Sequence, residues 1–208
     1  YRDAMENDKF GRFVYGIAPN SSADWGWIQH MLASLKPTGR MGIVLDRGSL
    51  FRGGSEEKIR RKVVEGDLIE CVIHLPENIF YNTGAPGCLI ILNKNKPPER
   101  RGKVLFIYAE EDYGKHDQLK RMNKLREEDV EKIVNAYKEF KDIPKYAKVT
   151  SLDEIRENDY NLSVTRYVDI FEEEEEIDIS RVFSELKRLE KERQKIDELV
   201  KEYVSQMI

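Results

Sequence analysis

Four short apolar runs constrain the fold of this chain more than any other feature of its sequence. The runs are MGIVL at 41–45, LIECVIHL at 68–75, CLIIL at 88–92 and VLFIY at 104–108. Amphipathic patterns at 21–35 and 55–65 precede the first two runs and predict helices. Short buried strands that alternate with helices predict an α/β sheet. The run MGIVL is typical of a strand that is buried on both faces.

The pattern changes after residue 110. An amphipathic helix is expected at 125–140, and Ser151 followed by Glu154 three residues later is a capping-box pattern. We therefore expect three parts, which are an α/β portion at 1–110, a helical or irregular extension at 111–179 and one long helix at 180–208.

The last of these parts has the most regular periodicity in the chain. Apolar residues recur there at alternating spacings of four and three, and only Arg193 interrupts them. Such a heptad seam favours pairing with another helix. Two interpretations remain open, namely packing on the chain's own domain and packing on a distant or intermolecular partner. The seam consists of Val182, Leu186, Leu189, Ile196, Val200, Tyr203 and Met207.

Composition narrows the class of protein. No stretch reaches the roughly 18 apolar residues of a membrane span, and the first residues lack a signal-peptide pattern, so we expect a cytoplasmic protein. The chain does not begin with Met, which suggests a piece of a longer protein. Cys71 and Cys88 lie in apolar runs and are expected to be reduced core residues. The three histidines do not cluster, so no metal site is expected.

Charge is distributed unevenly along the chain. Residues 36–103 carry 13 Lys and Arg against 8 Asp and Glu, whereas residues 151–208 carry 9 against 17. The basic middle suits contact with a polyanion, and the acidic end suits water or a basic partner. Two solvated surfaces of different composition would give the same pattern.

Two loops follow predicted strands, where open α/β sheets place their functional groups. The loop DRGSLFRGG at 46–54 carries Arg47, Arg52 and three glycines, which suit either a phosphate or a flexible turn with surface arginines. The loop at 76–86 carries Phe80 and Tyr81, which could stack on a planar ligand.

The neighbours of these aromatics, Asn82 and Thr83, could hydrogen-bond the same ligand. Alternatively, one aromatic closes the edge of the core. The sequence has no GxGxxG or Walker A pattern and no interpretable Ser/His/Asp or Cys/His set. The residues alone therefore indicate an α/β half-domain with a helical tail and no complete active site.

A series of segments, in order over nearly the whole chain, resembles one known family. The segments are ADWGWIQHMLASLKPTGRMGIVL, SLFRGG, EEKIRR, LIECVIHLPENIFYNTGAPGCLIILNKNKP, GKVLFIYA, NKLREEDVEKIV and SLDEIRENDYNLSVTRYV. Together they resemble the modification (methyltransferase) subunit of type I restriction-modification systems. That resemblance implies an adenine-N6 DNA methyltransferase that uses S-adenosylmethionine.

The same resemblance shows which motifs are missing. The family carries a DPxxGSG-like cofactor turn and an NPPF or NPPY catalytic motif, and neither occurs in this sequence. It therefore implies the C-terminal part of a Rossmann-like methyltransferase sheet, with its last strands including an antiparallel one, followed by an α-helical C-terminal region. This chain alone is expected to be catalytically incomplete and to bind no S-adenosylmethionine.

The resemblance also assigns roles to the loops. It implies that Phe80, or Tyr81 as the second candidate, packs against an adenine flipped out of the duplex, with Asn82 and Thr83 at the pocket rim. Arg47 and Arg52 would contact DNA phosphates. The sequence Asp46-Arg47-Gly48 departs from the family pattern, which commonly has Pro-His-Gly at this place.

The partners implied are double-stranded DNA, a specificity subunit with long helices, a second modification subunit and, in the full complex, a restriction subunit. The heptad seam would dock on the helices of the specificity subunit. Two other functions remain open. One is a non-catalytic assembly or DNA-binding module that docks on a specificity subunit. The other is a different nucleotide-binding α/β protein in which 74–96 is a small-ligand loop.

Overall fold

The computed structural model describes residues 1–171 and 179–207 of the chain. Within the last helix, the side chains of Val182, Tyr203 and Met207, three of the predicted seam residues, lie outside the described residues. The chain divides into two compact units, Tyr1–Ile170 and Phe171–Ile208. The boundary expected at residue 110 therefore falls inside the first unit.

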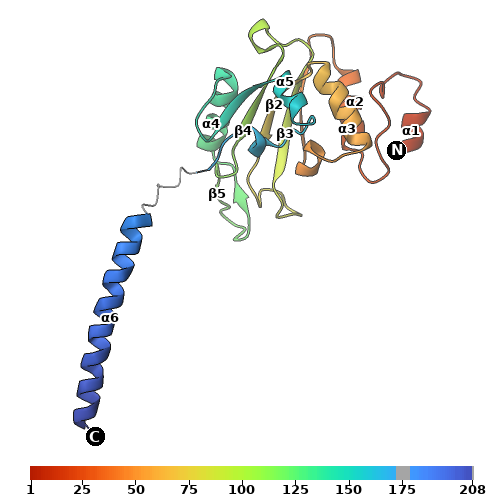
Figure 1. Ribbon diagram of the computed structural model, residues 1–208. Helices are drawn as coiled ribbons and strands as arrows, with labels where there is room; N and C mark the ends of the chain where they lie inside the picture. The colour runs from red at the N-terminus through yellow and green to blue at the C-terminus, as the bar shows by residue number, and fades with distance from the viewer. Residues whose placement is uncertain (172–178, 208) are drawn as a thin grey trace. The chain divides into compact units, whose positions relative to one another are not determined.

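The first unit is organised around a five-stranded mixed sheet (Figure 1). Its strands lie in the order β1-β3-β2-β4-β7. Strands β2 and β4 are parallel, β3 is antiparallel to both β1 and β2, and β7 is antiparallel to β4. The predicted α/β class with an antiparallel strand is confirmed. The strands are β1 (Arg40–Asp46), β2 (Ile69–His74), β3 (Gly87–Asn93), β4 (Lys103–Tyr108) and β7 (Ala147–Ser151).

Helices connect and cover these strands. The predicted helices are present as α2, α3 and α4, and the predicted cap is confirmed because Ser151 Oγ accepts a hydrogen bond from the Glu154 backbone N–H at 3.2 Å. A small two-stranded sheet, β5 (Gly114–Lys115) and β6 (Asn123–Lys124), follows β4. The helices are α1 (Arg2–Glu6), α2 (Asp24–Ser34), α3 (Ser55–Glu65), α4 (Glu127–Glu139) and α5 (Leu152–Glu157).

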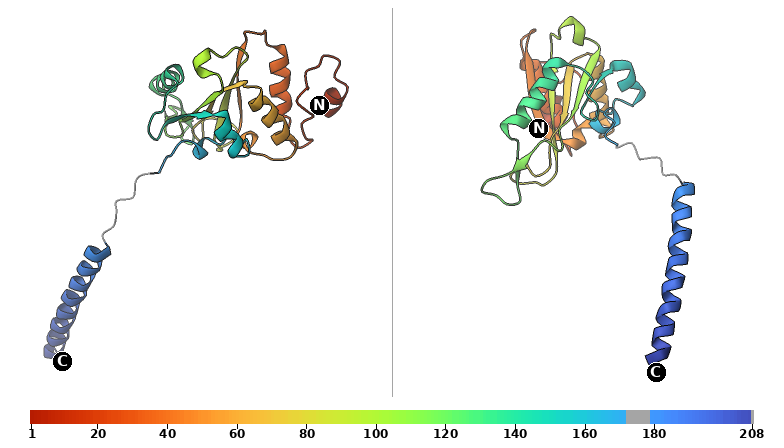
Figure 2. Two further views of the ribbon diagram at one scale, coloured as in Figure 1. Left: turned by 45° about the horizontal axis from the view of Figure 1, so that its top comes forward. Right: turned by 90° about the vertical axis from the view of Figure 1, so that its left-hand side faces the viewer.

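The sheet separates two apolar cores. Helices α2 and α3 lie on one face and α4 lies on the other, as Figure 2 shows. Side chains alternate along the central strands, so that Val72 and Phe106 point to the α2 and α3 side. Ile73 and Ile107 point to the α4 side. This alternation explains why the central runs are continuously apolar, since both of their faces are buried.

Strand β1 corrects one expectation from the sequence. It lies at the edge of the sheet and pairs with β3. Its Val44 side chain is 50% exposed, so the two-sided burial predicted for MGIVL is wrong. The run is apolar because Met41 is buried in the core and Ile43 packs partly against it. The expectation for the thiols is confirmed, because Cys71 and Cys88 are both free and buried.

Residues beyond 110 complete the first unit. Strand β7 extends the sheet, and the following segment places Leu162 and Tyr167 in the core on the α2 and α3 side. The Tyr167 ring stacks on Phe106 with centroids 4.1 Å apart. The buried Arg60 donates from Nε to the Tyr160 carbonyl at 2.7 Å, and burial lowers the pKa of Arg60 to about 10.

The second unit contains helix α6 (Ile179–Met207). The described seam residues are all more than half exposed, at 51% for Leu186, 53% for Leu189, 61% for Ile196 and 54% for Val200. Among the described residues, no helix combines the length and apolar character needed to cross a membrane.

Candidate functional site at the carboxyl edge of the sheet

Three strands end at the same edge of the sheet. Strands β1 and β2 both run antiparallel to β3, and β4 runs parallel to β2, so the carboxyl ends of β1, β2 and β4 coincide. The edge therefore gathers Arg47 after β1, the 75–86 loop after β2 and Glu110 after β4. Open α/β sheets commonly bind their ligands at this kind of edge.

A polar cluster around the buried His74 lies at the ends of β2 and β4. The Tyr108 hydroxyl donates to Glu110 Oε2 at 2.7 Å. His74 Nε2 lies 3.3 Å from the same oxygen, although not in the direction of a hydrogen bond. The His74 and Tyr108 rings meet edge to face with centroids 5.3 Å apart. We refer to His74, Tyr108 and Glu110 as the edge cluster.

Burial shifts the pKa values of His74 and Tyr108 in the edge cluster. It lowers the pKa of His74 below its ordinary value, an effect that Glu110 opposes and the charge of Arg47 increases. Burial, together with the hydrogen bond to Glu110, raises the pKa of Tyr108 to about 12. At neutral pH, His74 is therefore uncharged and Tyr108 remains a hydrogen-bond donor.

Arg47 and Arg52 have different surroundings. Arg47 is half-buried and acts electrostatically on His74 and Tyr108, but its side chain makes no hydrogen bond or ion pair within the described part of the chain. Arg52 binds Asp46 through Nη2 at 2.5 and 2.6 Å and Asp24 through Nη1 at 2.9 Å. The structure therefore brings Arg47 to the edge cluster and engages Arg52 in ion pairs.

These ion pairs have a steric requirement. A Cβ added at Gly48 would lie 2.6 Å from Arg52 Nε, so a side chain at this position would displace the guanidinium. Glu56 adds a third carboxylate, 3.3 Å from Nη1. A phosphate at Arg52 would have to compete with three carboxylates, so the predicted phosphate contact suits Arg47 better.

The 75–86 loop has a fixed base. The Leu75 N–H donates to the Gly87 carbonyl at 3.0 Å, and the Asn78 N–H donates to the Gly84 carbonyl at 3.2 Å. The buried Asn123 of β6 donates to the Asn78 carbonyl through its backbone and to the Glu77 carbonyl through Nδ2, both at 2.8 Å. The small sheet of β5 and β6 thus holds the base of the loop through hydrogen bonds from Asn123.

The two predicted aromatics at the tip of the loop differ in exposure. The Phe80 ring is half-buried against Gly87, where an added Cβ would lie 2.7 Å from Phe80 Cε2. Tyr81 is 82% exposed. Asn82 and Thr83 are also exposed, and Thr83 Oγ1 accepts from the Ala85 N–H at 3.1 Å. Phe80 therefore forms part of the wall, and Tyr81 offers a free ring face.

A polar groove of about 330 Å³ lies between this loop and the small sheet. Glu77, Glu110, Lys115 and Asn123 contribute to its lining. No group of residues suited to a metal ion occurs among those that the structure describes. The arrangement offers hydrogen bonds, charge and an aromatic face, which are the means of binding a ligand and holding it in position.

The sequence reasoning missed the edge cluster. His74 is far in the sequence from Tyr108 and Glu110, and no motif links it to them. The available signal was positional, because His74 ends one predicted strand and Tyr108 ends another that proves parallel to it. Polar residues at the carboxyl ends of two parallel strands lie at the same edge of the sheet. Their proximity could therefore have been inferred only once the two strands were known to be parallel.

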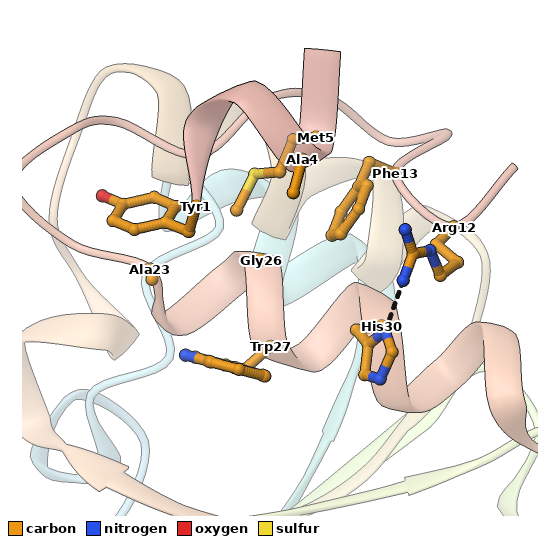
Figure 3. A pocket seen from close by; sticks show the side chains of 9 residues that line it. All are labelled: Tyr1, Ala4, Met5, Arg12, Phe13, Ala23, Gly26, Trp27 and His30. Atoms are coloured by element: carbon orange, nitrogen blue, oxygen red, sulfur yellow. Dashed lines mark hydrogen bonds between the residues drawn. The ribbon is translucent and has the colours of Figure 1, made fainter. Parts of the chain in front are cut away.

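A second cavity, of about 160 Å³, lies between the N-terminal segment and α2 (Figure 3). Met5 packs so closely on Gly26 that a Cβ there would overlap the Met5 methyl group. Trp27 lies along its margin, and Arg12 Nη1 is 3.4 Å from His30 Nδ1. Its lining is mainly apolar, so it offers packing and little chemistry.

Comparisons with known proteins give a consistent result. Residues 1–176 match the model of the family described as N-6 DNA Methylase. The type I restriction enzyme MjaVIII methylase subunit of Methanocaldococcus jannaschii is 49% identical over 195 residues, which cover 94% of this chain and 33% of that subunit. The MjaVII methylase subunit of the same organism is 50% identical over 186 residues, covering 89% and 32%.

A solved structure shows the same similarity. The type I restriction-modification methyltransferase subunit from Streptococcus thermophilus superposes with a TM-score of 0.72 and 42% identity. The match covers 81% of this chain and 35% of that one. The chain thus spans about a third of the length of the relatives it matches.

Proposed function

The chain belongs to the N-6 DNA methylase family, and from this premise we propose that it is part of the modification subunit of a type I restriction-modification system. The intact subunit would transfer a methyl group from S-adenosylmethionine to the N6 amine of adenine in DNA. The match that extends over 94% of the chain at 49% identity to one such subunit carries the proposal.

The carboxyl edge of the sheet would complete the pocket for the target base. An adenine inside a duplex must be flipped out before its amine can react. Although the resemblance makes Phe80 the first candidate, we propose Tyr81, whose ring is exposed, as the residue that stacks on the flipped base. The half-buried Phe80 would form the wall beside it. The exposed Asn82 and Thr83 would lie at the pocket rim. The hydrogen-bonded base of the loop supports this role, because it limits the motion of the tip.

Arg47 would contact a DNA phosphate next to this pocket. It is a half-buried cation without a carboxylate partner in the described part of the chain, and the ion pairs of Arg52 make that residue a weaker candidate. A phosphate contact positions the duplex and does not read its sequence. Binding through Arg47 should therefore weaken with increasing salt.

S-Adenosylmethionine does not fit the residues present here. The groove beside the 75–86 loop has no glycine among its lining residues, and the sequence has neither the DPxxGSG-like turn nor an NPPF or NPPY motif. We assign the cofactor to the remainder of the intact subunit, and this chain to base positioning, DNA contact and subunit assembly.

Assembly is the proposed role of α6. Its exposed seam would dock on helices of a specificity subunit that also binds a second modification subunit, with a restriction subunit joining the full complex. The same seam favours the alternative function, a non-catalytic assembly or DNA-binding module. Measuring DNA methylation by the intact subunit distinguishes the two functions, since a non-catalytic module would show no methyl transfer.

The proposal can be tested with Tyr81→Ala and Phe80→Ala in the intact subunit. Methyl transfer to DNA would be measured together with binding of the same duplex. Loss of stacking is worth roughly 1–3 kcal/mol per base, so kcat/KM should fall by about 5- to 150-fold. Phe10→Ala removes another exposed aromatic and serves as the control. Wild-type kcat/KM in both loop variants would overturn the proposed base pocket.

A further inference from the structure

Helix α6 presents a distinct charge pattern beside its seam. In a coiled coil the seam occupies positions a and d, and positions e and g face the flanks of the partner helix. With Leu186 at a and Leu189 at d, every charged residue at e or g that the structure describes is acidic. These residues are Glu185, Glu190, Glu192 and Asp197, all of them exposed.

Apart from Arg193, which lies in the seam, the basic residues of the helix whose side chains the structure describes lie on its outer side. They are Lys187, Arg188, Lys191, Lys195 and Lys201, at positions b, c or f. Arg188 lies 3.6 Å from Glu185 and 4.0 Å from Glu192, and these exposed contacts contribute little stability. The flanks of the seam therefore present negative charge to any helix that packs there.

This pattern disfavours pairing with a second copy of the chain. In a parallel dimer in register, Glu185 would face Glu190 of the other copy and Glu192 would face Asp197. Arg193, at position a, would meet its own counterpart inside the seam. Reversing one helix would still oppose acidic flanks. Like charges across an interface disfavour the pairing of two such helices. The exposed seam therefore requires a partner helix whose flanks are not acidic.

We propose that α6 pairs with a helix of another protein whose apolar seam is flanked by lysine or arginine. This inference rests on the proposed assembly function and specifies the chemistry of the partner. Complementary flanks set partner choice in coiled coils, and a single charged residue in the seam, here Arg193, sets the register. Because the flanking carboxylates are exposed, the selectivity decreases as salt increases.

The test uses the full chain and two synthetic helical peptides of 29 residues. Both peptides have the same apolar seam, and one has lysine and the other glutamate at positions e and g. At low salt the chain should bind the lysine peptide at least tenfold more tightly by calorimetry, and the difference should shrink in 1 M salt. Sedimentation should show a monomeric chain at the same concentrations. Equal binding of the peptides, binding of neither, or self-association would overturn the proposal.

Two sets of variants separate charge from helix content. Reversing the flanks with E185K, E190K, E192K and D197K together should reverse the peptide preference. Reversing four outer residues with K187E, K191E, K195E and K201E should leave it unchanged, with helix content followed by circular dichroism. If both sets act alike, the flanks do not select the partner.

The proposed function is tested separately in the intact subunit. Leu189→Glu with Ile196→Glu disrupts the seam itself and should abolish assembly with the specificity subunit. If the seam variant loses assembly but the flank variant keeps it, the assembly function stands and the inference about a basic partner fails. If the seam variant still assembles, both fail.

Discussion

The buried His74 makes the stability of this protein sensitive to pH. Its pKa is lowered by burial, so below pH of about 6.5 the unfolded chain binds a proton that the folded chain does not. The free energy of unfolding should therefore fall as the pH decreases through about 6.5, by at most about 1.4 kcal/mol per pH unit from this group.

His74→Gln should flatten that dependence in urea unfolding measured at several pH values. His116→Gln, at a histidine that is not buried, should retain it. An unchanged slope in His74→Gln would show that His74 is not the group responsible.

Thr150 provides a second prediction at the scale of single residues. Its side chain is fully buried in β7, and Oγ1 has no hydrogen-bond partner in the described part of the chain. An unsatisfied buried hydroxyl costs roughly 1–3 kcal/mol, so Thr150→Val should leave the free energy of unfolding unchanged or raise it by up to that amount. Thr83→Val, at an exposed hydroxyl that accepts a hydrogen bond, is the control. A loss above about 1 kcal/mol in Thr150→Val would indicate that the hydroxyl is satisfied.

The sequence could locate the candidate site but not its internal geometry. Phe80 and Tyr81 were identifiable because two aromatics interrupt a polar loop between apolar runs. Their different exposure could not be read from the sequence, because it depends on Gly87, against which Phe80 packs. The ion pair of Arg52 with Asp24 was equally hidden, since Asp24 lies 28 residues earlier in the chain, at the start of α2.

At the scale of elements, a hydrogen bond to a buried carboxylate holds α4 on the sheet. The Tyr137 hydroxyl donates to Glu70 Oε2 at 2.6 Å, and Arg100 Nη1 lies 3.4 Å from the other oxygen. Glu70 is fully buried in β2. Removing one donor leaves a buried carboxylate short of a hydrogen bond, so Tyr137→Phe should lower the free energy of unfolding by about 1–3 kcal/mol.

Urea unfolding of Tyr137→Phe measures this loss directly. Val130→Ala is a matched control on the same helix, because Val130 is exposed and should change stability by less than about 0.5 kcal/mol. Equal effects of the two substitutions would mean that the hydrogen bond to Glu70 does not anchor α4.

The strands differ in how readily they can be predicted from their sequences. The runs that form β2, β3 and β4 are continuously apolar because both faces of each strand are covered. Strand β7 was not expected, since its sequence AKVTS is short and includes a lysine. It becomes a strand because its backbone pairs with β4 from Lys103 to Ile107, a tertiary contact that local pattern cannot reveal.

At the scale of the whole molecule, the residues after 110 belong to the same core as the strands before them. Leu162 and Tyr167 pack on the face that α2 and α3 cover, and β7 extends the sheet. A chain cut at residue 110 would uncover that face and leave β4 without its antiparallel neighbour. A chain cut after Ile170 keeps both cores intact.

Two truncations test this organisation. Residues 1–170 should unfold cooperatively with a midpoint within a few degrees of that of the full chain, because both buried cores lie within them. Residues 1–110 should show no cooperative transition, since the loss of Tyr160, Leu162 and Tyr167 exposes apolar side chains whose burial contributes roughly 1.5–3 kcal/mol each. Thermal unfolding followed by circular dichroism distinguishes these outcomes. Cooperative unfolding of residues 1–110 would show instead that the α/β portion is an independent domain and that β7 is an accessory strand.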